Sequence, residues 1–114
     1  MKRGDVVIVD YPFSDARGSK VRPALVVQAD DKNAQLSDTI IALITSRLHR
    51  TLDTHVLIDI STPDGQQSGL RLRSEVQCEN LCTIDQKFIL GVIGAMSKST
   101  MREVDDCLRR ALGL

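Results

Sequence analysis

Short apolar stretches rich in β-branched residues, separated by polar or turn-forming segments, make up the first 96 residues of the chain. Runs of this length and composition predict strands rather than helices. We expect strands at 4–11, 24–28, 39–45, 55–60 and 88–96, and one or two more within 69–81. The chain is therefore expected to be mainly β.

The pattern changes to a helical period near the C-terminus. Apolar residues share one helical face there, namely Met101, Val104, Cys107, Leu108, Ala111 and Leu112. Thr100 and Glu103 have the spacing of a capping box, and Gly113 is a stop signal. The sequence thus predicts an amphipathic C-terminal helix.

The first predicted strand, 4–11, is apolar or β-branched at both alternating positions, which indicates that both of its faces are covered. The interior of a small barrel and a partner subunit would provide that cover. Gly91 and Gly94 interrupt the last strand, and they indicate a bend or bulge of the kind that closes a barrel.

At 114 residues with 42% hydrophobic residues, the chain has the size of one compact domain, 1–114. Aromatic residues make up only 3%, so a platform for stacking bases has little to build on. The 15 basic residues balance 15 acidic ones, which argues against binding through an overall positive field. Any contact with nucleic acid must therefore be local.

The three cysteines lack the spacing of a zinc finger or redox motif, which indicates reduced thiols in a reducing compartment. Cys78 and Cys82 with His49 or His55 would offer a zinc site, but buried thiols are the more frequent case. The apolar run Val6 to Val9 is too short for a signal peptide or a membrane span. We expect a cytoplasmic protein without metal or membrane contact.

Arg22 stands directly before Pro23 and the apolar run 24–27. Proline disfavours helical geometry in the residue before it, so Arg22 is expected to be extended at the mouth of a buried strand. A planar guanidinium on such a support suits phosphate or carboxylate. The sequence therefore predicts an anion site on a β scaffold.

Five short motifs occur in order along the chain: Gly4-Asp5-Val6-Val7, Arg22-Pro23-Ala24-Leu25-Val26-Val27, Ile44-Thr45-Ser46, Thr83-Ile84-Asp85 and Ile93-Gly94-x-Met96-Ser97. Each is weak alone, but their order and spacing resemble the MazF/PemK/Kid family of toxin endoribonucleases. The resemblance implies an SH3-like small β-barrel of the CcdB/MazF-like type with a C-terminal helix. It also implies a homodimer that is the toxin of a type II toxin–antitoxin system.

The resemblance further implies a sequence-specific endoribonuclease that cuts single-stranded RNA, often mRNA, without a cofactor. The 2′-hydroxyl attacks the adjacent phosphate and leaves a 2′,3′-cyclic phosphate and a 5′-hydroxyl. The expected partners are single-stranded RNA, a second copy of the chain, and a cognate antitoxin whose acidic disordered segment folds on binding.

Three residues match catalytic positions of that family. Arg22 matches an arginine that neutralises charge on the phosphoryl oxygens, and Thr45 matches a threonine whose hydroxyl holds a phosphate oxygen. Glu79 lies where relatives carry an acidic residue, and it is a candidate general base or an orienter of Arg22.

The chain departs from some relatives at two points. Gln77 stands where they have an arginine, and the loop before Arg22 lacks their histidine. The resemblance therefore leaves open which groups move the protons, and Arg71 or Arg73 is an alternative source of the missing charge.

Polar and basic residues near Arg22 and Thr45 are expected to contact RNA, namely Asp15, Ser19, Lys20, Ser46, Arg47 and Arg73. Basic side chains would follow the phosphates, whereas Asp15, Ser19 and Ser46 would bind splayed bases. If Thr45 and Ser46 both belong to the strand, they point to opposite faces.

Two other functions stay open from the sequence. A non-enzymatic CcdB-like toxin would bind DNA gyrase and leave RNA intact. A catalytically silent RNA-binding barrel would fit Gln77 and the missing histidine.

Overall fold

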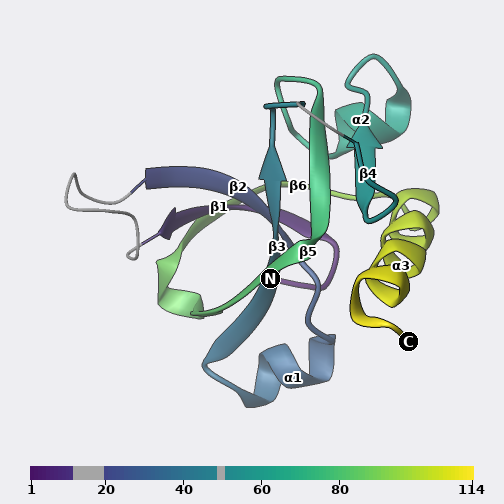
Figure 1. Cartoon of the computed structure of the whole chain (residues 1–114). Coiled ribbons are helices and arrows are strands. Elements are labelled where there is room, and N and C mark those ends of the chain that lie inside the picture. The colour runs from purple at the N-terminus through teal and green to yellow at the C-terminus, as the bar shows by residue number, and fades with distance from the viewer. Residues whose placement is uncertain (12–19, 49–50) are drawn as a thin grey trace.

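Figure 1 shows the computed structural model of the chain, which describes residues 1–11, 20–48 and 51–114. The elements in chain order are β1 (Asp5–Tyr11), β2 (Lys20–Val26), α1 (Asp30–Gln35), β3 (Asp38–Thr45), β4 (His55–Ile58), α2 (Pro63–Gln67), β5 (Ser74–Asp85), the 3₁₀ turn η1 (Gln86–Phe88), β6 (Ile89–Ala95) and α3 (Lys98–Leu112). The strands form one antiparallel sheet in the order β4-β5-β3-β2-β1-β6. The prediction of a mainly β chain with a C-terminal helix is confirmed.

The sheet curves strongly (Figure 1), but its end strands β4 and β6 do not pair with each other in the described part of the chain. It is thus an open sheet rather than a barrel closed by hydrogen bonds. Two register shifts distort the β1–β6 pairing, one between the partners of Val6 and Val7 and one between those of Ile8 and Val9. They begin opposite Gly94 and Gly91, so the irregularity predicted at these glycines is confirmed.

A crossing of two backbone segments brings the far ends of the sheet together. The turn after α2, at Ser68 and Gly69, lies directly on Ile93 and Gly94 of β6. A Cβ atom at Gly69 would overlap the carbonyl of Ile93, and one at Gly94 would overlap that of Ser68. Gly69 also has a φ of 75°, which side chains rarely adopt. Only glycine therefore permits this approach, which fixes where the segment 70–74 runs.

The sheet buries side chains on both faces, in two clusters. The first cluster includes Val6, Leu25 and Ile44 and is covered by Val104 and Cys107 of α3. The second includes Val7 and Val9 on the opposite face. The expectation that the first strand is covered on both faces is therefore confirmed, and for Val7 and Val9 the cover comes from the chain itself, since both are fully buried.

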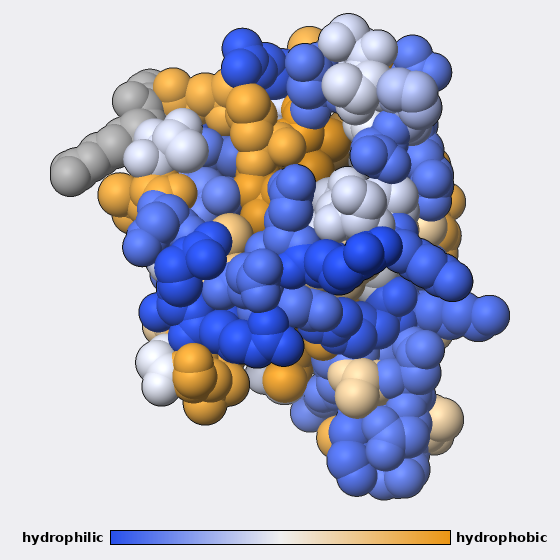
Figure 2. All heavy atoms as spheres, turned by 90° about the vertical axis from the view of Figure 1, so that its right-hand side faces the viewer, coloured by the Kyte–Doolittle hydropathy of each residue, from blue (hydrophilic) through white to orange (hydrophobic). Residues whose placement is uncertain are grey.

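The C-terminal helix begins earlier than the sequence indicated. Ser97 is its N-cap and accepts a hydrogen bond from the backbone N–H of Thr100 at 3.1 Å, so the predicted cap at Thr100 was wrong. Gly113 ends the helix in the left-handed conformation, as predicted. The exposed side of α3 is hydrophilic, as the blue band across Figure 2 shows. No helix of the described residues is long and apolar enough to cross a membrane.

Three elements differ from the sequence pattern. Residues 30–35 form α1 because the buried Asn33 side chain accepts hydrogen bonds from Gln28 and Thr39, which ties a polar segment to β3. Residues 63–67 form α2, where Thr62 accepts the N–H of Gly65 as N-cap. The region 69–81 contributes a single strand, β5, which continues to Asp85.

Candidate functional site

Arg22, Thr45 and Glu75 lie on three neighbouring strands. In the β2–β3 pairing Ala24 faces Leu43, and continuing this register by two residues places Arg22 opposite Thr45. Thr45 in turn faces Glu75 of β5. Directly paired residues project to the same face of a sheet, so the three form one row.

A groove opens where β2 begins and β3 ends, with a volume of about 230 Å³. Its polar lining consists of Arg22, Thr45, Ser46, Arg47, Arg71 and Ser74. The groove contains three arginines and, among the described residues, no acidic side chain. It is a local positive site on a chain without net charge, suited to phosphate groups.

The hydroxyl of Thr45 is oriented by its own loop. Its Oγ1 accepts the backbone N–H of Arg47 at 3.1 Å, which leaves the hydroxyl hydrogen free to donate into the groove. Because β3 ends at Thr45, Ser46 does not follow the strand alternation and lines the same groove. Thr45 and Ser46 were expected to point to opposite faces only if both belonged to the strand, and this condition is not met.

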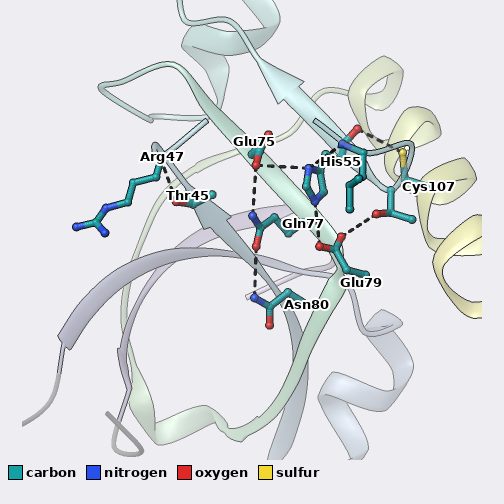
Figure 3. A network of polar contacts seen from close by, with 10 residues as sticks. Thr45, Arg47, His55, Glu75, Gln77, Glu79, Asn80 and Cys107 are labelled. Atoms are coloured by element: carbon teal, nitrogen blue, oxygen red, sulfur yellow. Dashed lines mark hydrogen bonds and ion pairs between the residues drawn. The ribbon is translucent and has the colours of Figure 1, made fainter. Parts of the chain in front are cut away.

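A second polar cluster, which we call the His55 network, lies beside the groove (Figure 3). His55 Nε2 lies 2.9 Å from Glu79 Oε2, and His55 Nδ1 lies 3.4 Å from Glu75 Oε1. Thr54 Oγ1 donates to Glu79 Oε1 at 2.8 Å. Gln77 Nε2 donates to Glu75 Oε1 at 3.3 Å, so Glu75 contacts both His55 and Gln77.

Burial differs sharply within this network. The side chains of His55 and Glu75 are 4% and 2% exposed, whereas that of Glu79 is 39% exposed. Burial raises the pKa of Glu79, but hydrogen bonds from His55, from its own backbone N–H and from Thr54 outweigh this effect and leave the pKa below its ordinary value. Glu79 is therefore an ionised carboxylate that a ligand can reach.

The family model of the PemK-like, MazF-like toxins of type II toxin–antitoxin systems matches residues 2–112. The chain belongs to this toxin family. It is similar in structure to an endoribonuclease from a mycobacterial species in complex with its cognate antitoxin, with 24% identity, a TM-score of 0.79, and 100% of this chain and 96% of that chain covered. The Mycobacterium tuberculosis toxin MazF-mt6 matches with 24% identity, a TM-score of 0.79, and 96% and 97% covered.

A MazE–MazF complex from Deinococcus radiodurans is similar over 100% of this chain and 97% of that chain, with 18% identity and a TM-score of 0.78. These structures share the fold of this toxin along nearly its whole length. The predicted fold class is thereby confirmed.

The toxin brings together two of the three residues matched to catalytic positions. Arg22 and Thr45 line the same groove, whereas Glu79 belongs to the His55 network. The His55 ring lies within 3.4 Å of Glu75 and 2.9 Å of Glu79, so Glu79 lies beside the row that Thr45 and Glu75 form. A ligand that contacts all three must therefore reach from the groove to the His55 network.

Of the residues expected to bind RNA, Ser46 and Arg47 line the groove. Arg73 does not line it, whereas Arg71, the alternative, does. Arg73 instead lies near Asp59, whose pKa is lowered mainly by hydrogen bonds from Ser61 and less by the charge of Arg73.

The remaining RNA-binding predictions, on Asp15 and Ser19, lie outside the described residues. Of Lys20, only the backbone belongs to the described part of the toxin, as the first residue of β2.

The zinc alternative of Cys78 and Cys82 does not fit the structure. Cys78 lies in the first core cluster, and Cys82 packs against the second on the other face. Burial raises the pKa of the Cys78 thiol to about 12, which disfavours the thiolate that metals bind. The described residues contain no group of three His, Cys, Asp or Glu side chains that could hold a metal ion.

Sequence reasoning missed Glu75 and the position of His55. Glu75, Gln77 and Glu79 alternate with Val76 and Cys78, and this alternation is the signal that could have found Glu75. Their contacts with His55 depend on the β4–β5 register, in which His55 faces Gln77 and Leu57 faces Glu75.

Proposed function

We propose that this toxin is a metal-independent, sequence-specific endoribonuclease that cuts single-stranded RNA such as mRNA. The observation that carries the proposal is the groove in which Arg22, Thr45, Arg47 and Arg71 converge, in a member of the PemK-like, MazF-like toxins. Similar folds belong to proteins named endoribonuclease and MazF, which supports the same activity here.

In the proposed reaction the RNA supplies its own nucleophile. The 2′-oxygen forms a bond to the neighbouring phosphorus, and the bond from phosphorus to the 5′-oxygen breaks. Arg22 neutralises the charge that develops on the phosphoryl oxygens, and the Thr45 hydroxyl donates to one of them. Arg47 and Arg71 hold adjacent phosphates.

Glu79 is the proposed acceptor of the 2′-hydroxyl proton. Its ionised, partly exposed carboxylate supports this role, because a general base must be deprotonated and within reach of the substrate. The RNA then lies along the face of β3 and β5, between Glu79 and the arginines. The leaving 5′-oxygen takes a proton from water, and Glu79 later returns its proton to solvent.

We further propose that the toxin works in the cytoplasm as a homodimer, that residues 1–114 are one domain, and that an acidic, disordered segment of a cognate antitoxin covers the groove. The absence of acidic side chains from the groove lining, within the described residues, supports this complementarity. Two of the similar structures are complexes with an antitoxin, which supports the same kind of partner. Scattering measurements of the purified toxin test the dimer, because a monomer mass at micromolar concentration would contradict it.

The function is tested by incubating the toxin with a long single-stranded RNA in EDTA and mapping the cuts and their end groups. The wild type should make discrete cuts with cyclic-phosphate ends, and Arg22→Ala should cut about 10²–10³ times more slowly. Arg102→Ala is a matched control, because Arg102 is exposed on α3 and does not line the groove. Intact RNA from the folded wild type would refute the proposal and favour a protein target such as gyrase.

A further inference from the structure

The ring of His55 lies between two carboxylates of β5, at 3.4 Å from Glu75 and 2.9 Å from Glu79. Figure 3 shows Glu75 and Gln77 between Thr45 on one side and His55 on the other. The ring is nearly buried, and only the far carboxylate, that of Glu79, is substantially exposed. The histidine is thus placed behind Glu79, on the side away from solvent.

The hydrogen bonds define which ring nitrogen carries the hydrogen. The backbone N–H of Leu52 donates to His55 Nδ1 at 3.2 Å, so Nδ1 is an acceptor in the neutral ring. The ring hydrogen then lies on Nε2, which donates it to Glu79 Oε2. With Thr54 donating to Glu79 Oε1, each oxygen of Glu79 accepts one side-chain hydrogen bond and keeps a lone pair for a ligand.

Glu75 is costly to the fold if it has no further role. It is 1% exposed, and its Oε2 makes no hydrogen bond within the described chain. A buried carboxylate with an unpaired oxygen is destabilising, and an apolar residue of similar size would avoid that cost. Its Oε1 accepts a hydrogen bond from Gln77 Nε2 and lies 3.4 Å from His55 Nδ1 without a hydrogen bond to it, so what Glu75 provides is the orientation of Gln77 beside the ring.

We propose that His55, held through Nδ1 by the backbone N–H of Leu52, is a positioning residue that fixes the Glu79 carboxylate facing the RNA. The inference rests on the proposed function, in which Glu79 accepts the proton of the 2′-hydroxyl. The loop before Arg22 contains no histidine. The imidazole next to the proposed base comes instead from His55 of β4.

Among the described residues, the ionisable side chains that face the His55 ring are Glu75 and Glu79, both from β5. From α3, Cys107 Sγ contacts the carbonyl oxygens of Asp53 and His55, and Arg110 Nε donates to that of Asp53. These helix contacts hold the backbone of Asp53 and His55, at the start of β4, rather than the ring.

The test compares His55→Phe, which removes the donor, with His55→Gln, which retains an N–H donor but does not titrate. Cleavage rates at the mapped sites are measured from about pH 3 to pH 8, because the pKa of Glu79 lies below its ordinary value and the acid limb of the wild type lies there too. Loss of the donor disfavours the ionised form of Glu79, so the acid limb of the rate profile should move to higher pH in His55→Phe. A shift of one pH unit lowers the rate on that limb about tenfold. His55→Gln should restore a profile close to that of the wild type.

Two more variants separate positioning from a structural effect. Thr54→Val removes the other side-chain donor to Glu79 and should shift the limb in the same direction by less. Glu75→Gln removes the charge beside Nδ1 but neither side-chain hydrogen bond to Glu79, so it should leave the acid limb near its wild-type pH. An acid limb that stays at the wild-type pH in folded His55→Phe, with an equal loss of rate at every pH, would overturn the proposal.

The ring itself is tested by ¹⁵N NMR of the wild type, which does not depend on a variant folding or on cleavage. A neutral ring with its hydrogen on Nε2 is expected, and a hydrogen on Nδ1 would overturn the inference. A wild type that leaves RNA intact would refute the proposed function, while the NMR result would still decide whether His55 donates to Glu79.

Discussion

The groove around Arg22 and the His55 network occupy neighbouring parts of one sheet face, yet they differ in charge. The groove contains three arginines and the three hydroxyl side chains of Thr45, Ser46 and Ser74. The network contains two carboxylates and one histidine. One region is suited to hold phosphate and the other to accept protons.

The difference teaches that neither region is sufficient for RNA cleavage in the proposed reaction. Charge neutralisation comes from the groove, and proton transfer comes from the network. The two meet where β3 pairs with β5, at Thr45 and Glu75. A substitution in one region should therefore produce a different kinetic defect from a substitution in the other.

The largest separation is expected between Glu79→Gln and Thr45→Val. Removing a general base typically costs about 10²–10⁴-fold in rate, and it should also abolish the acid limb of the pH profile. Thr45→Val should lower the rate at every pH without moving the limb, because its hydroxyl does not transfer a proton in the reaction. Single-turnover rates against pH measure both effects, and an unchanged acid limb in Glu79→Gln would show that another group is the base.

A substitution at the backbone crossing should damage the groove and spare the network. Gly94→Ala places a methyl group against the carbonyl of Ser68, and we expect it to lower the free energy of unfolding by about 1–3 kcal/mol. Gly91→Ala is the matched control in the same strand, since a Cβ there meets nothing within 4 Å. Thermal unfolding of both variants measures this loss of stability. Equal stability of Gly94→Ala and Gly91→Ala would show that the backbone at Ser68 moves away from the added methyl group at little cost.

A comparison of Arg71→Ala with Arg73→Ala tests which basic side chains of this segment bind RNA. Arg71 lines it and Arg73 does not, so Arg71→Ala should weaken RNA binding several-fold and Arg73→Ala should weaken it less. Each lost phosphate contact should reduce the salt dependence of binding by about 0.7 in the log–log slope for single strands. Titrations at several salt concentrations measure this slope, and a larger change for Arg73→Ala would place the RNA outside the groove.

The smallest expected effect concerns stability in acid. Because the pKa of Glu79 is lower in the folded state than its ordinary value, its ionised form stabilises the fold above that ordinary value. This contribution is lost as the pH falls through the lowered pKa. Urea unfolding should therefore show a weaker acid destabilisation for Glu79→Gln than for the wild type, by a small amount because Glu79 is 39% exposed.

The parts of the fold that the sequence predicted depend on local patterns. The strand runs and the apolar face of α3 follow from period and β-branching, and Arg22 before Pro23 is extended as a strand residue. The helix α1 was missed because it depends on Asn33, whose buried hydrogen bonds with Gln28 and Thr39 cannot be read from a polar segment.

The candidate site was predictable only in part, for the same reason. Arg22 and Thr45 were found by motif, and the pairing of β2 with β3 brings them to one groove. The link between His55 and Glu79 depends on a register shift between Ala42 and Leu43, where β5 departs from regular pairing with β3. Glu79 lies in this irregular part of β5 and contacts Thr54, just before β4. Such an irregularity is a property of the assembled sheet, so it cannot be predicted from a local sequence pattern.

The crossing of Gly69 and Gly94 also bears on how this toxin can diversify. Two positions without side chains set the course of the chain that follows, so the exposed residues Arg71 and Leu72 contribute to the groove without having to define its shape. Their side chains can then be exchanged at little structural cost, and the RNA sequence that is recognised can drift while the architecture stays constant. A library that varies these positions and retains both glycines is accordingly a direct route to toxins with new cleavage preferences.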